Sequence, residues 1–407
     1  MTSTNECTTD KCNSTECASE CSGAHLICDA SHSLWGTLPT PETSPACTIE
    51  PGMHITIDTL SHEGLLEDQG RDPLRFFTAQ GVAPCDVPAE AMDVADNGVH
   101  VHGAGPHIIT RPIEVRGAAA GDWLRIDIDR LTPRVPYGVI SNRHGRGVLP
   151  GLMPRGGRAV TSIFARQIVD ATHGGEPALM GIMERKGPDA VSNLAGTAPH
   201  APLYDIARDG VLRCDERLPE NVAGFELHPF LGIMGVTPLP GAEVRSTIPP
   251  GDFGGNIDIK LLTEGTTLYL PVQVDGAGFY VGDPHFAQGD GEVALTAMEA
   301  SLTAKLTVSV VGGEEFRATF GNLHGPFIVT DHDIVTTGRA DSIDGALQEC
   351  VRESLCCLER YARMDAEHAY AFLSAAADFS ISEAVDIVMG VHCRMPRSVA
   401  CAAATEM

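Results

Sequence analysis

The sequence predicts a β-rich α+β protein, with a β-sandwich or β-barrel core and an α+β C-terminal part that contains two to three helices. Three observations support this fold class. Glycine and proline contribute 43 and 27 of the 407 residues, which leaves little room for long helices. Several segments alternate apolar and polar residues with a period of two, as half-buried strands do. Helical periodicity is concentrated in the last quarter of the chain, so strands precede helices instead of alternating with them.

Residues 1–46 are predicted to be an acidic, Cys-rich N-terminal tail, because they are polar and run into the Pro-rich stretch LPTPETSPAC. Five of the 13 cysteines of the chain lie in this segment: Cys7, Cys12, Cys17, Cys21 and Cys28. Their spacing fits the C-x₂₋₄-C pairs of zinc sites only loosely, which favours a flexible, reduced tail over a metal or cluster site. A metal-storage or sensor module is the alternative.

Residues 47–310 are predicted to form the β-rich catalytic core. The clearest period-2 alternation of apolar and polar residues occurs in four segments: 53–58, 124–129, 268–274 and 302–310. In the third segment, Pro271 indicates an edge position or a bulge, because proline cannot donate to a β-ladder. The Gly-rich connections at 142–158 and 246–256 are long enough to be functional loops.

Residues 311–407 are predicted to form the α+β or helical C-terminal part. Apolar residues recur every three to four positions from Ile343 to Ala362, which predicts a helix of roughly five turns. A second helix is expected after Asp365, a suitable N-cap residue. A shorter third helix is expected over SEAVDIV, which follows Ile381.

Charge and missing motifs exclude several classes of function. The chain has 28 basic and 54 acidic residues, a net charge of −26, which disfavours binding to nucleic acid or to anionic membranes. No basic region followed by an apolar stretch opens the sequence, and no apolar run reaches the 18 residues of a membrane helix. A cytoplasmic location is therefore expected. Neither a P-loop nor a G-x-S-x-G elbow occurs.

The densest polar cluster is GDPHFAQGDGE at residues 282–292. In an extended chain, residues two apart point the same way, so Asp283 and His285 could converge on one ion. Asp290 and Glu292 would form a second pair beyond the glycine turn. A carboxylate and an imidazole are ligands that catalytic zinc uses, and a nearby free carboxylate is the usual base for its water. The alternative is a plain turn in which aspartates cap backbone amides.

Two further segments carry candidate site residues. His100 and His102 form an H-x-H pair, which on a strand would present both imidazoles on one face to a metal, although pairs also arise by chance among 16 histidines. Around Gly254 and Gly255, backbone amides could approach a ligand, and Asn256 could donate to a developing oxyanion. Lys260 could pair with Asp258, polarise a carbonyl, or be a solvated partner of nearby acids.

The segment STIPPGDFGGNIDIK…GDPHFAQGDGE resembles the central signature of the acetamidase/formamidase family, where GGN-x-D and GD-x-H-A-A-Q-G-D-G-E recur at this separation. TIEPG, LGIMGV and ADFSISEAVD support the resemblance. It implies hydrolysis of a small linear amide to a carboxylate and ammonia, in a β-rich fold that assembles as a homodimer or larger oligomer. The pocket residues that it implies are Asn256, Asp258, Asp283, His285, Gln288, Asp290 and Glu292.

Two departures from the family pattern bear on function. The segment VRGAAAGD at 115–122 lacks two glutamates that the family usually has, and Phe286 replaces a small residue, which could narrow the pocket. The leading hypothesis is an amidase with a divalent ion, zinc being favoured over calcium or another ion, held by Asp283 and His285 with His100 or His102. Glu292 would be the general base.

Two alternatives remain open at this point. One is a metal-independent amidase that uses a carboxylate and Lys260. The other is a non-catalytic paralogue that binds a small amide or urea on the same scaffold.

Overall fold

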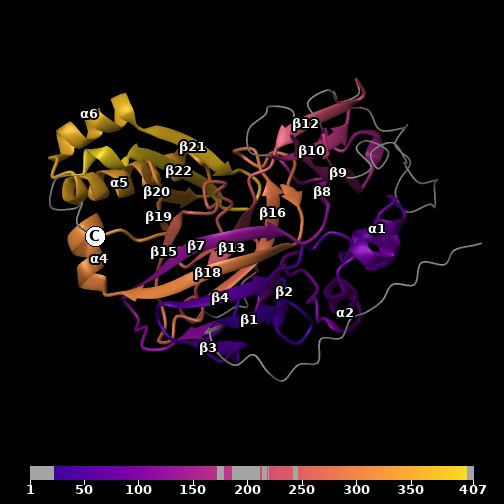
Figure 1. The fold of residues 1–407 in the computed structure, drawn as a ribbon. Coiled ribbons are helices and arrows are strands. Elements are labelled where there is room, and N and C mark those ends of the chain that lie inside the picture. The colour runs from indigo at the N-terminus through magenta and orange to yellow at the C-terminus, as the bar shows by residue number, and fades with distance from the viewer. Residues whose placement is uncertain are drawn as a thin grey trace, which may run out of the picture.

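The computed structural model describes residues 23–171, 178–185, 211–212, 218, 220–241 and 246–400. Within these residues, two large β-sheets and one small sheet make up most of the structure, and the longest helices lie near the C-terminus (Figure 1). The predicted β-rich fold with a helical C-terminal part is therefore confirmed. No helix in the described ranges is long and apolar enough to cross a membrane.

The first large sheet contains all four of the strands with the clearest period-2 pattern. Their inward residues, such as Ile55, Ile126 and Leu306, are fully buried, as the alternation predicts. The predicted edge position or bulge at Pro271 is wrong, because its strand lies between two others; Pro271 is the last residue of the strand, beyond the pairing on one side, which ends at Tyr269. The sheet order is β1 (Ala24–Ile27), β4 (Met53–Asp58), β18 (Leu302–Val311), β7 (Trp123–Pro133), β15 (Thr267–Pro271), β19 (Phe327–Val329), β20 (Asp333–Ala340), β22 (Met389–Pro396) and β21 (Asp378–Glu383).

The second large sheet is built around β16, which carries the GDPHFA part of the densest polar cluster. One apolar cluster joins the two sheets: Ile57 and Leu306 come from the first, and Ile233 and Val281 from the second. The order is β12 (Val222–Glu226), β10 (Ala178–Glu184), β9 (Val160–Asp170), β8 (Tyr137–Arg143), β17 (Met298–Glu299), β16 (Tyr280–Ala287), β13 (Phe230–Gly235) and β14 (Gly254–Asn256). Strand β11 (Val211–Leu212) pairs with β9, β5 (Ile108–Thr110) pairs with β16, and β2 (Ser33–Trp35) pairs with β5; β3 (Cys47–Ile49) and β6 (Ile113–Val115) form the small sheet.

Two of the three predicted C-terminal helices are confirmed. Helix α5 (Ile343–Tyr361) begins at Ser342, whose side chain accepts from the amide of Gly345, and packs on β20 and β22. Helix α6 (Ala366–Ala376) begins at Asp365, which accepts from the amide of His368. Both lie beside the β20–β22 end of the first sheet (Figure 1). The shorter helices are α1 (Pro73–Thr78), α2 (Ala89–Asn97) and α4 (Gly313–Phe320).

The third predicted helix, SEAVDIV, is wrong. Its first two residues end strand β21, the next five form a turn, and β22 follows as the antiparallel partner. Glu383 stabilises the turn, because its buried carboxylate accepts from the amides of Val385 and Asp386. An apolar pattern of seven residues is too short to tell a helix from a hairpin, and sheet pairing decided the outcome.

The predicted tail boundary at residue 46 does not match the structure. Strand β1 pairs in parallel with β4, and β2 pairs with β5, so residues 24–46 belong to the folded body. Cys28 is a free, buried core residue, and burial raises the pKa of its thiol to about 12. Cys7, Cys12, Cys17 and Cys21 lie outside the described residues. The division at residue 310 stays a prediction; the first sheet runs across it, from β18 through β7 and β15 to β19.

Candidate active site

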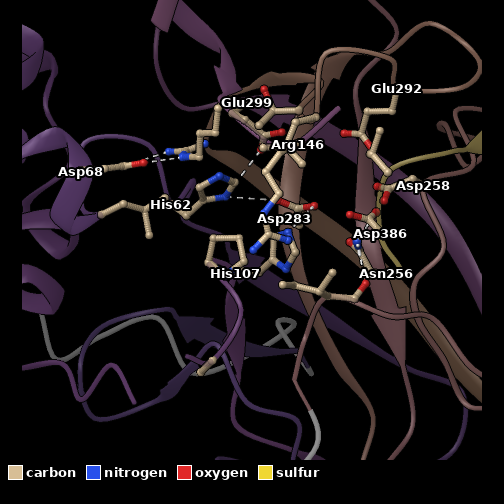
Figure 2. Close-up of a pocket in the computed structure, with 18 of the residues that line it drawn as sticks. His62, Asp68, His107, Arg146, Asn256, Asp258, Asp283, Glu292, Glu299 and Asp386 are labelled. Carbon is tan, nitrogen blue, oxygen red and sulfur yellow. Dashed lines mark hydrogen bonds and ion pairs between the residues drawn. The ribbon is translucent and has the colours of Figure 1, made fainter. Parts of the chain in front are cut away.

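A cavity of about 320 Å³ is lined by strands of the second large sheet, by loops and by the turn that follows β21. Its wall combines residues from distant parts of the chain, including His62, His107, Asp283, Glu299 and Asp386. Figure 2 shows Asp283 near the centre, with His62 and His107 on one side and Asp258, Glu292 and Asp386 on the other. We call the first side, together with Asp283, His285 and Glu299, the histidine half, and the second side the carboxyl half.

The histidine half is organised by strand β16, where Asp283 and His285 point the same way. His285 Nε2 lies 3.1 Å from Asp283 Oδ2, so the predicted convergence of the two side chains is confirmed. Glu299, on the neighbouring strand β17, places Oε1 3.1 Å from the same nitrogen. All three side chains are at most 4 % exposed. An imidazole is therefore held between two carboxylates away from bulk water.

Two more histidines face these carboxylates. His62, in the segment after β4, places Nδ1 3.5 Å from Asp283 Oδ1. His107, just before β5, places Nε2 3.8 Å from Asp283 Oδ2. The two imidazoles meet edge to face, with ring centroids 5.4 Å apart. Asp283 thus has an imidazole on each of three sides.

The charges of the histidine half are strongly coupled. Burial opposes ionisation, but His107 and His285 outweigh it and hold the pKa of Asp283 well below its usual range. Burial also disfavours a charged imidazole, yet the nearby carboxylates of Asp283 and Glu63 raise the pKa of His62 to about 10. At His107 burial dominates and lowers the pKa to about 4, which leaves a neutral imidazole.

The carboxyl half has the opposite character. Asp258, Glu292 and Asp386 are buried carboxyl groups that face one another. Burial raises the pKa of Asp258 well above its usual range, and the charge of Glu292 adds to this. Burial, together with the charge of Asp386, also raises the pKa of Glu292 well above its usual range. Burial, together with the charge of Glu383, raises the pKa of Asp386 in the same way. Carboxyl groups this close oppose one another's ionisation, so the protonation of each depends on the others.

The backbone around the site is locally strained. Asp258, Asp283 and Glu292 have φ angles of 45°, 51° and 44°, in the left-handed region that non-glycine residues rarely adopt. Such strain concentrates at functional sites.

Gly232 on β13 is needed for a steric reason. A Cβ there would collide with Asp258 Oδ1 and lie 2.6 Å from His285 Cε1. Bare backbone at this position therefore leaves room for the side chains of both halves.

The structure does not bring His100 and His102 to the buried cluster. The predicted strand at 99–102 does not form; His100 makes one isolated bridge, and His102 is exposed in a turn. His100 lines the cavity and stacks on Trp35, but its ring nitrogens already contact Glu67 Oε1 at 2.9 Å and the Gly105 carbonyl at 3.0 Å. The H-x-H metal hypothesis lacks the strand on which it depended.

Three other predicted residues lie outside the cavity lining. Lys260 and Asp290 form a half-exposed ion pair with a 3.0 Å contact, so Asp290 does not pair with Glu292. The amide of Gln288 donates to the Asp258 carbonyl at 2.8 Å and to the Ser382 carbonyl at 3.3 Å. Gln288 thus ties the carboxyl half to β21.

Asn256 lines the cavity, but its donors are already used. Nδ2 donates to Asp386 Oδ2 at 2.7 Å and to the Ile248 carbonyl at 3.2 Å. Gly254 and Gly255 pair with β13 and do not line the cavity. The expected oxyanion hole from these residues does not match the geometry, and Asn256 is positioned to orient Asp386.

Both departures from the family pattern also lie away from the cavity lining. Phe286 is fully buried in β16 and is not among the residues that line the cavity. It does not narrow the pocket. The segment 115–122 begins at the last residue of β6 and contributes no lining residue.

Sequence reasoning missed His62, Glu299 and Asp386. His62 follows β4 in the short motif SHEG, which has no periodicity or recognised spacing. Asp386 lies in ADFSISEAVD, a segment quoted only in support of the family resemblance. Contacts across more than 200 positions, such as that between His62 and Asp283, leave no local pattern in a single sequence.

The donor set of the histidine half suits a metal ion. In three sets of buried side chains, each residue offers one possible ligand atom, and the atoms of a set all lie within 4.8 Å of one another. The sets are His62, His107 and Asp283; Asp283, His285 and Glu299; and Asp258, His285 and Glu292. Both nitrogens of His62, together with Asp283 Oδ1 and Glu299 Oε2, make no hydrogen bond in the described structure, although they are buried. Polar atoms left in this way indicate a missing partner.

Comparison with known proteins agrees with the resemblance. The model of the acetamidase/formamidase family matches residues 83–401. A putative formamidase of Schizosaccharomyces pombe is 31% identical over 229 residues, 50% of this chain and 52% of that protein. A formamidase of Methylophilus methylotrophus is 31% identical over 46% of this chain and 47% of that protein. The chain thus spans about half the length of these two relatives.

Longer matches come from another relative and from solved structures. An acetamidase of Mycolicibacterium smegmatis is 29% identical over 83% of this chain and 78% of that protein. A predicted acetamidase/formamidase from Thermoanaerobacter tengcongensis has a TM-score of 0.64 at 21% identity, over 93% of this chain and 97% of that one. An acetamidase from Bacillus halodurans has a TM-score of 0.62 at 22% identity, over 91% and 97%. Because the family model covers most of the chain, and the fold agrees, the protein belongs to the acetamidase/formamidase family.

Proposed function

We propose that this protein is an amidohydrolase that cleaves the C–N bond of a small linear amide, such as formamide or acetamide, to a carboxylate and ammonia. Family membership and the formamidase and acetamidase relatives support the reaction class. The observation that carries the proposal is the juxtaposition of the two halves: an imidazole between two carboxylates, beside three further buried carboxyl groups, along one cavity.

A divalent ion fits the histidine half, with zinc the favoured identity. His285 Nε2, Asp283 Oδ2 and Glu299 Oε1 would hold it, because the two carboxylate oxygens each lie 3.1 Å from this nitrogen. Ligand atoms on a tetrahedral zinc lie about 3.3 Å apart, since each is about 2.0 Å from the ion. Such an ion, when bound, supplies Lewis-acid polarisation and a lowered pKa of water.

Glu292 is assigned the role of general base. It lines the cavity, is 7 % exposed, and belongs to the buried set that includes His285. Its carboxylate would take a proton from the attacking water and deliver it to the leaving nitrogen, so that ammonia departs as the C–N bond breaks. Asp258 and Asp386, at the side of Glu292, would hold and share that proton, and Asn256 orients Asp386.

The position of Lys260 does not favour the metal-independent alternative. Its ammonium pairs with Asp290 near the surface, and it is absent from the cavity lining. A lysine so placed cannot polarise a carbonyl inside the cavity.

An ammonia-release assay on the purified full-length protein tests the proposed reaction. The panel contains formamide, acetamide, propionamide, urea and larger amides. Turnover of at least one small amide, lost on treatment with a chelator and restored by Zn²⁺, is the expected result. Saturable binding of amides without any ammonia release would instead support the non-catalytic alternative.

Two further proposals concern the protein as a whole. We infer a homodimer or larger oligomer and a cytoplasmic location, as expected for a family member with a small neutral substrate. Size-exclusion chromatography with light scattering measures the first, and fractionation of cells measures the second.

A further inference from the structure

The cavity is large for the two amides that give the family its name. Its volume is about 320 Å³, whereas one water molecule takes up about 30 Å³ of the liquid. Formamide and acetamide are only a few times larger than water, so either would leave most of the cavity to solvent. Exclusion of water strengthens electrostatic interactions at the reacting atoms, which a substrate achieves by filling the space around them. The volume therefore favours a longer amide.

The wall of the cavity changes in character from its buried end to its mouth. The buried end holds the ionisable side chains of the two halves, such as Asp283 and Glu292, which are 4 % and 7 % exposed. Arg146, which lines the same cavity, is exposed and marks the mouth (Figure 2). Apolar lining residues of intermediate burial lie between these extremes: Ala104, Pro106, Ile248, Leu295 and Val385.

Leu295 is held in a strained conformation within this apolar wall. Its φ of 103° lies in the region that non-glycine residues rarely adopt. The amide of Leu295 donates to the Glu292 carbonyl at 3.0 Å, so one turn carries both the assigned general base and this apolar side chain. Strain of this kind persists where the surrounding structure enforces it, and it concentrates at functional sites. Leu295 is thus placed to contact the carbon chain of a substrate.

The loop that carries Arg146 is fixed to the same turn. The loop connects β8 to β9, and the amide of Val148 donates to the Val293 carbonyl at 3.0 Å. The side-chain amide of Asn142 donates to the Ala294 carbonyl at 2.8 Å. These bonds hold Arg146 at a set position relative to the segment that carries the assigned general base.

Arg146 differs from the other charged side chains near the mouth in its lack of a partner. Arg143 is paired with Asp68, with Nε 2.6 Å from Oδ2. Glu67 Oε1 lies 2.9 Å from His100 Nδ1. Among the residues that the structure describes, no carboxylate pairs with the Arg146 guanidinium. A guanidinium matches a carboxylate in shape, because it can donate two parallel hydrogen bonds to it.

We propose that the substrate is the monoamide of an aliphatic dicarboxylic acid. Its amide lies at the buried end, its methylene chain lies along the apolar wall, and its carboxylate pairs with Arg146, which is the specificity-determining residue. Water adds to the amide carbon and the C–N bond breaks, which gives a dicarboxylate and ammonium.

This inference narrows the substrate of the proposed function, on which its catalytic meaning rests. The charge of the protein agrees with it. In a chain of net charge −26, an unpaired cation at the mouth attracts an anion that the rest of the surface repels.

Kinetics of the full-length protein on matched substrates test the proposal. The probes are succinamate, glutaramate and adipamate, each compared with the neutral amide in which an isopropyl group replaces the carboxylate. For the best of the three, we expect kcat/KM to exceed that of its neutral counterpart by about tenfold or more, as for hydrogen bonds to a charged group. The advantage should shrink at high ionic strength, because Arg146 is exposed.

Substitution of Arg146 separates charge from geometry. We expect Arg146→Gln to lower kcat/KM for the anionic amide about tenfold through a higher KM, because the pair is remote from the reacting atoms. The neutral amide should lose much less. Arg146→Lys should keep part of the advantage, since an ammonium retains the charge but not the planar fork. Arg155→Gln, at an exposed arginine of the same loop that does not line the cavity, is the matched control.

Isothermal titration calorimetry distinguishes failure of this inference from failure of the proposed function. If no amide releases ammonia, the amidase function is refuted, and the binding of the same amides then tests the carboxylate site by itself. Tighter binding of the anionic amide, lost in Arg146→Gln and kept in Arg155→Gln, would leave the inference standing.

Two outcomes overturn the inference. The first is an equal change, or no change, for the anionic and neutral amides in Arg146→Gln, with folding checked by circular dichroism. The second is a wild-type protein that uses or binds the neutral amides as well as the anionic ones.

Discussion

The two halves of the cavity place buried carboxyl groups beside different neighbours. In the histidine half, His107 and His285 outweigh burial and hold the pKa of Asp283 well below its usual range, whereas burial and Asp283 raise the pKa of Glu299 to about 7. In the carboxyl half the acids face one another, and burial raises the pKa values of Asp258, Glu292 and Asp386. The contrast between Asp283 and Asp258, which are both buried, teaches that neighbouring charges decide the direction in which the pKa of a buried carboxyl group moves.

The division also corresponds to different parts of the chain. The histidine half is assembled from β16, β17 and the segments before β5 and after β4. The carboxyl half draws Glu292 and Asp258 from loops, and Asp386 from the hairpin of β21 and β22. The C-terminal part therefore contributes directly to the cavity.

The largest effect is expected from Glu292→Gln, which removes the general base but keeps the volume of the side chain. We expect kcat to fall by about 10²–10⁴-fold, with the zinc content unchanged, because the ligands lie in the other half. Ammonia release and elemental analysis measure the two quantities. Glu226→Gln, at an exposed carboxylate, is the matched control. A loss of less than about threefold would show that this half does not move the proton.

Gly232→Ala tests whether the two halves depend on one backbone position. Because the new Cβ would press on both Asp258 and His285, we expect a loss of about 1–3 kcal/mol in the free energy of unfolding. A loss of at least tenfold in kcat/KM is expected with it. Denaturant titration and steady-state kinetics are the measurements. Gly289→Ala is the control, since a Cβ there meets no atom within 4 Å. Equal behaviour of the two variants would remove the geometric link between the halves.

His392→Gln tests the support of the carboxyl half. His392 on β22 is buried, with Nδ1 2.8 Å from the Ser382 hydroxyl. Burial lowers the pKa of His392 from 6.5 to about 4. The positive charges of Lys260 and Arg394 lower it further, and the negative charge of Asp290 acts in the opposite direction. As the pH falls, His392 is therefore protonated in the unfolded chain before it is protonated in the folded protein. This favours unfolding, so stability is lost as the pH falls from about 6.5 towards 4.

We expect this histidine to account for about 2 kcal/mol of the stability lost between pH 7.5 and pH 5. Urea titrations at both pH values measure the loss, which should be smaller by that amount in His392→Gln. His228→Gln should lose as much stability as the wild type. An identical pH dependence in wild type and His392→Gln would contradict the assignment.

The smallest effect is expected from Lys260→Ala. A half-exposed ion pair contributes at most about 1 kcal/mol, and Lys260 does not line the cavity. We expect kcat/KM to change by less than about threefold in the ammonia-release assay. Inactivity of a folded variant, with Lys305→Ala unaffected, would revive the metal-independent alternative.

Local patterns predicted much of the fold. The period-2 segments became β4, β7, β15 and β18, because a strand with one buried face carries its apolar residues at alternate positions. Helix α5 followed from apolar spacing and α6 from its N-cap. The turn before β22 was mistaken for a helix, since sheet pairing and not propensity determines a segment of that length.

The candidate site could be predicted only where its residues are neighbours in sequence. Asp283 and His285 converge because they are two apart on a strand, which any extended chain would achieve. Their partnership with His62 could not be predicted, because nothing in a single sequence records which loop ends beside which strand.

By itself, then, the sequence determined the strand-rich fold class, the two C-terminal helices, the family resemblance and the Asp283–His285 pair. These depend on short-range geometry and on motifs within about 40 residues. Only the tertiary structure decided that His62, Glu299 and Asp386 complete the cavity and that Lys260 and His102 do not. Tertiary packing brings distant segments together, and burial and the neighbouring charges then set which carboxyl groups ionise readily.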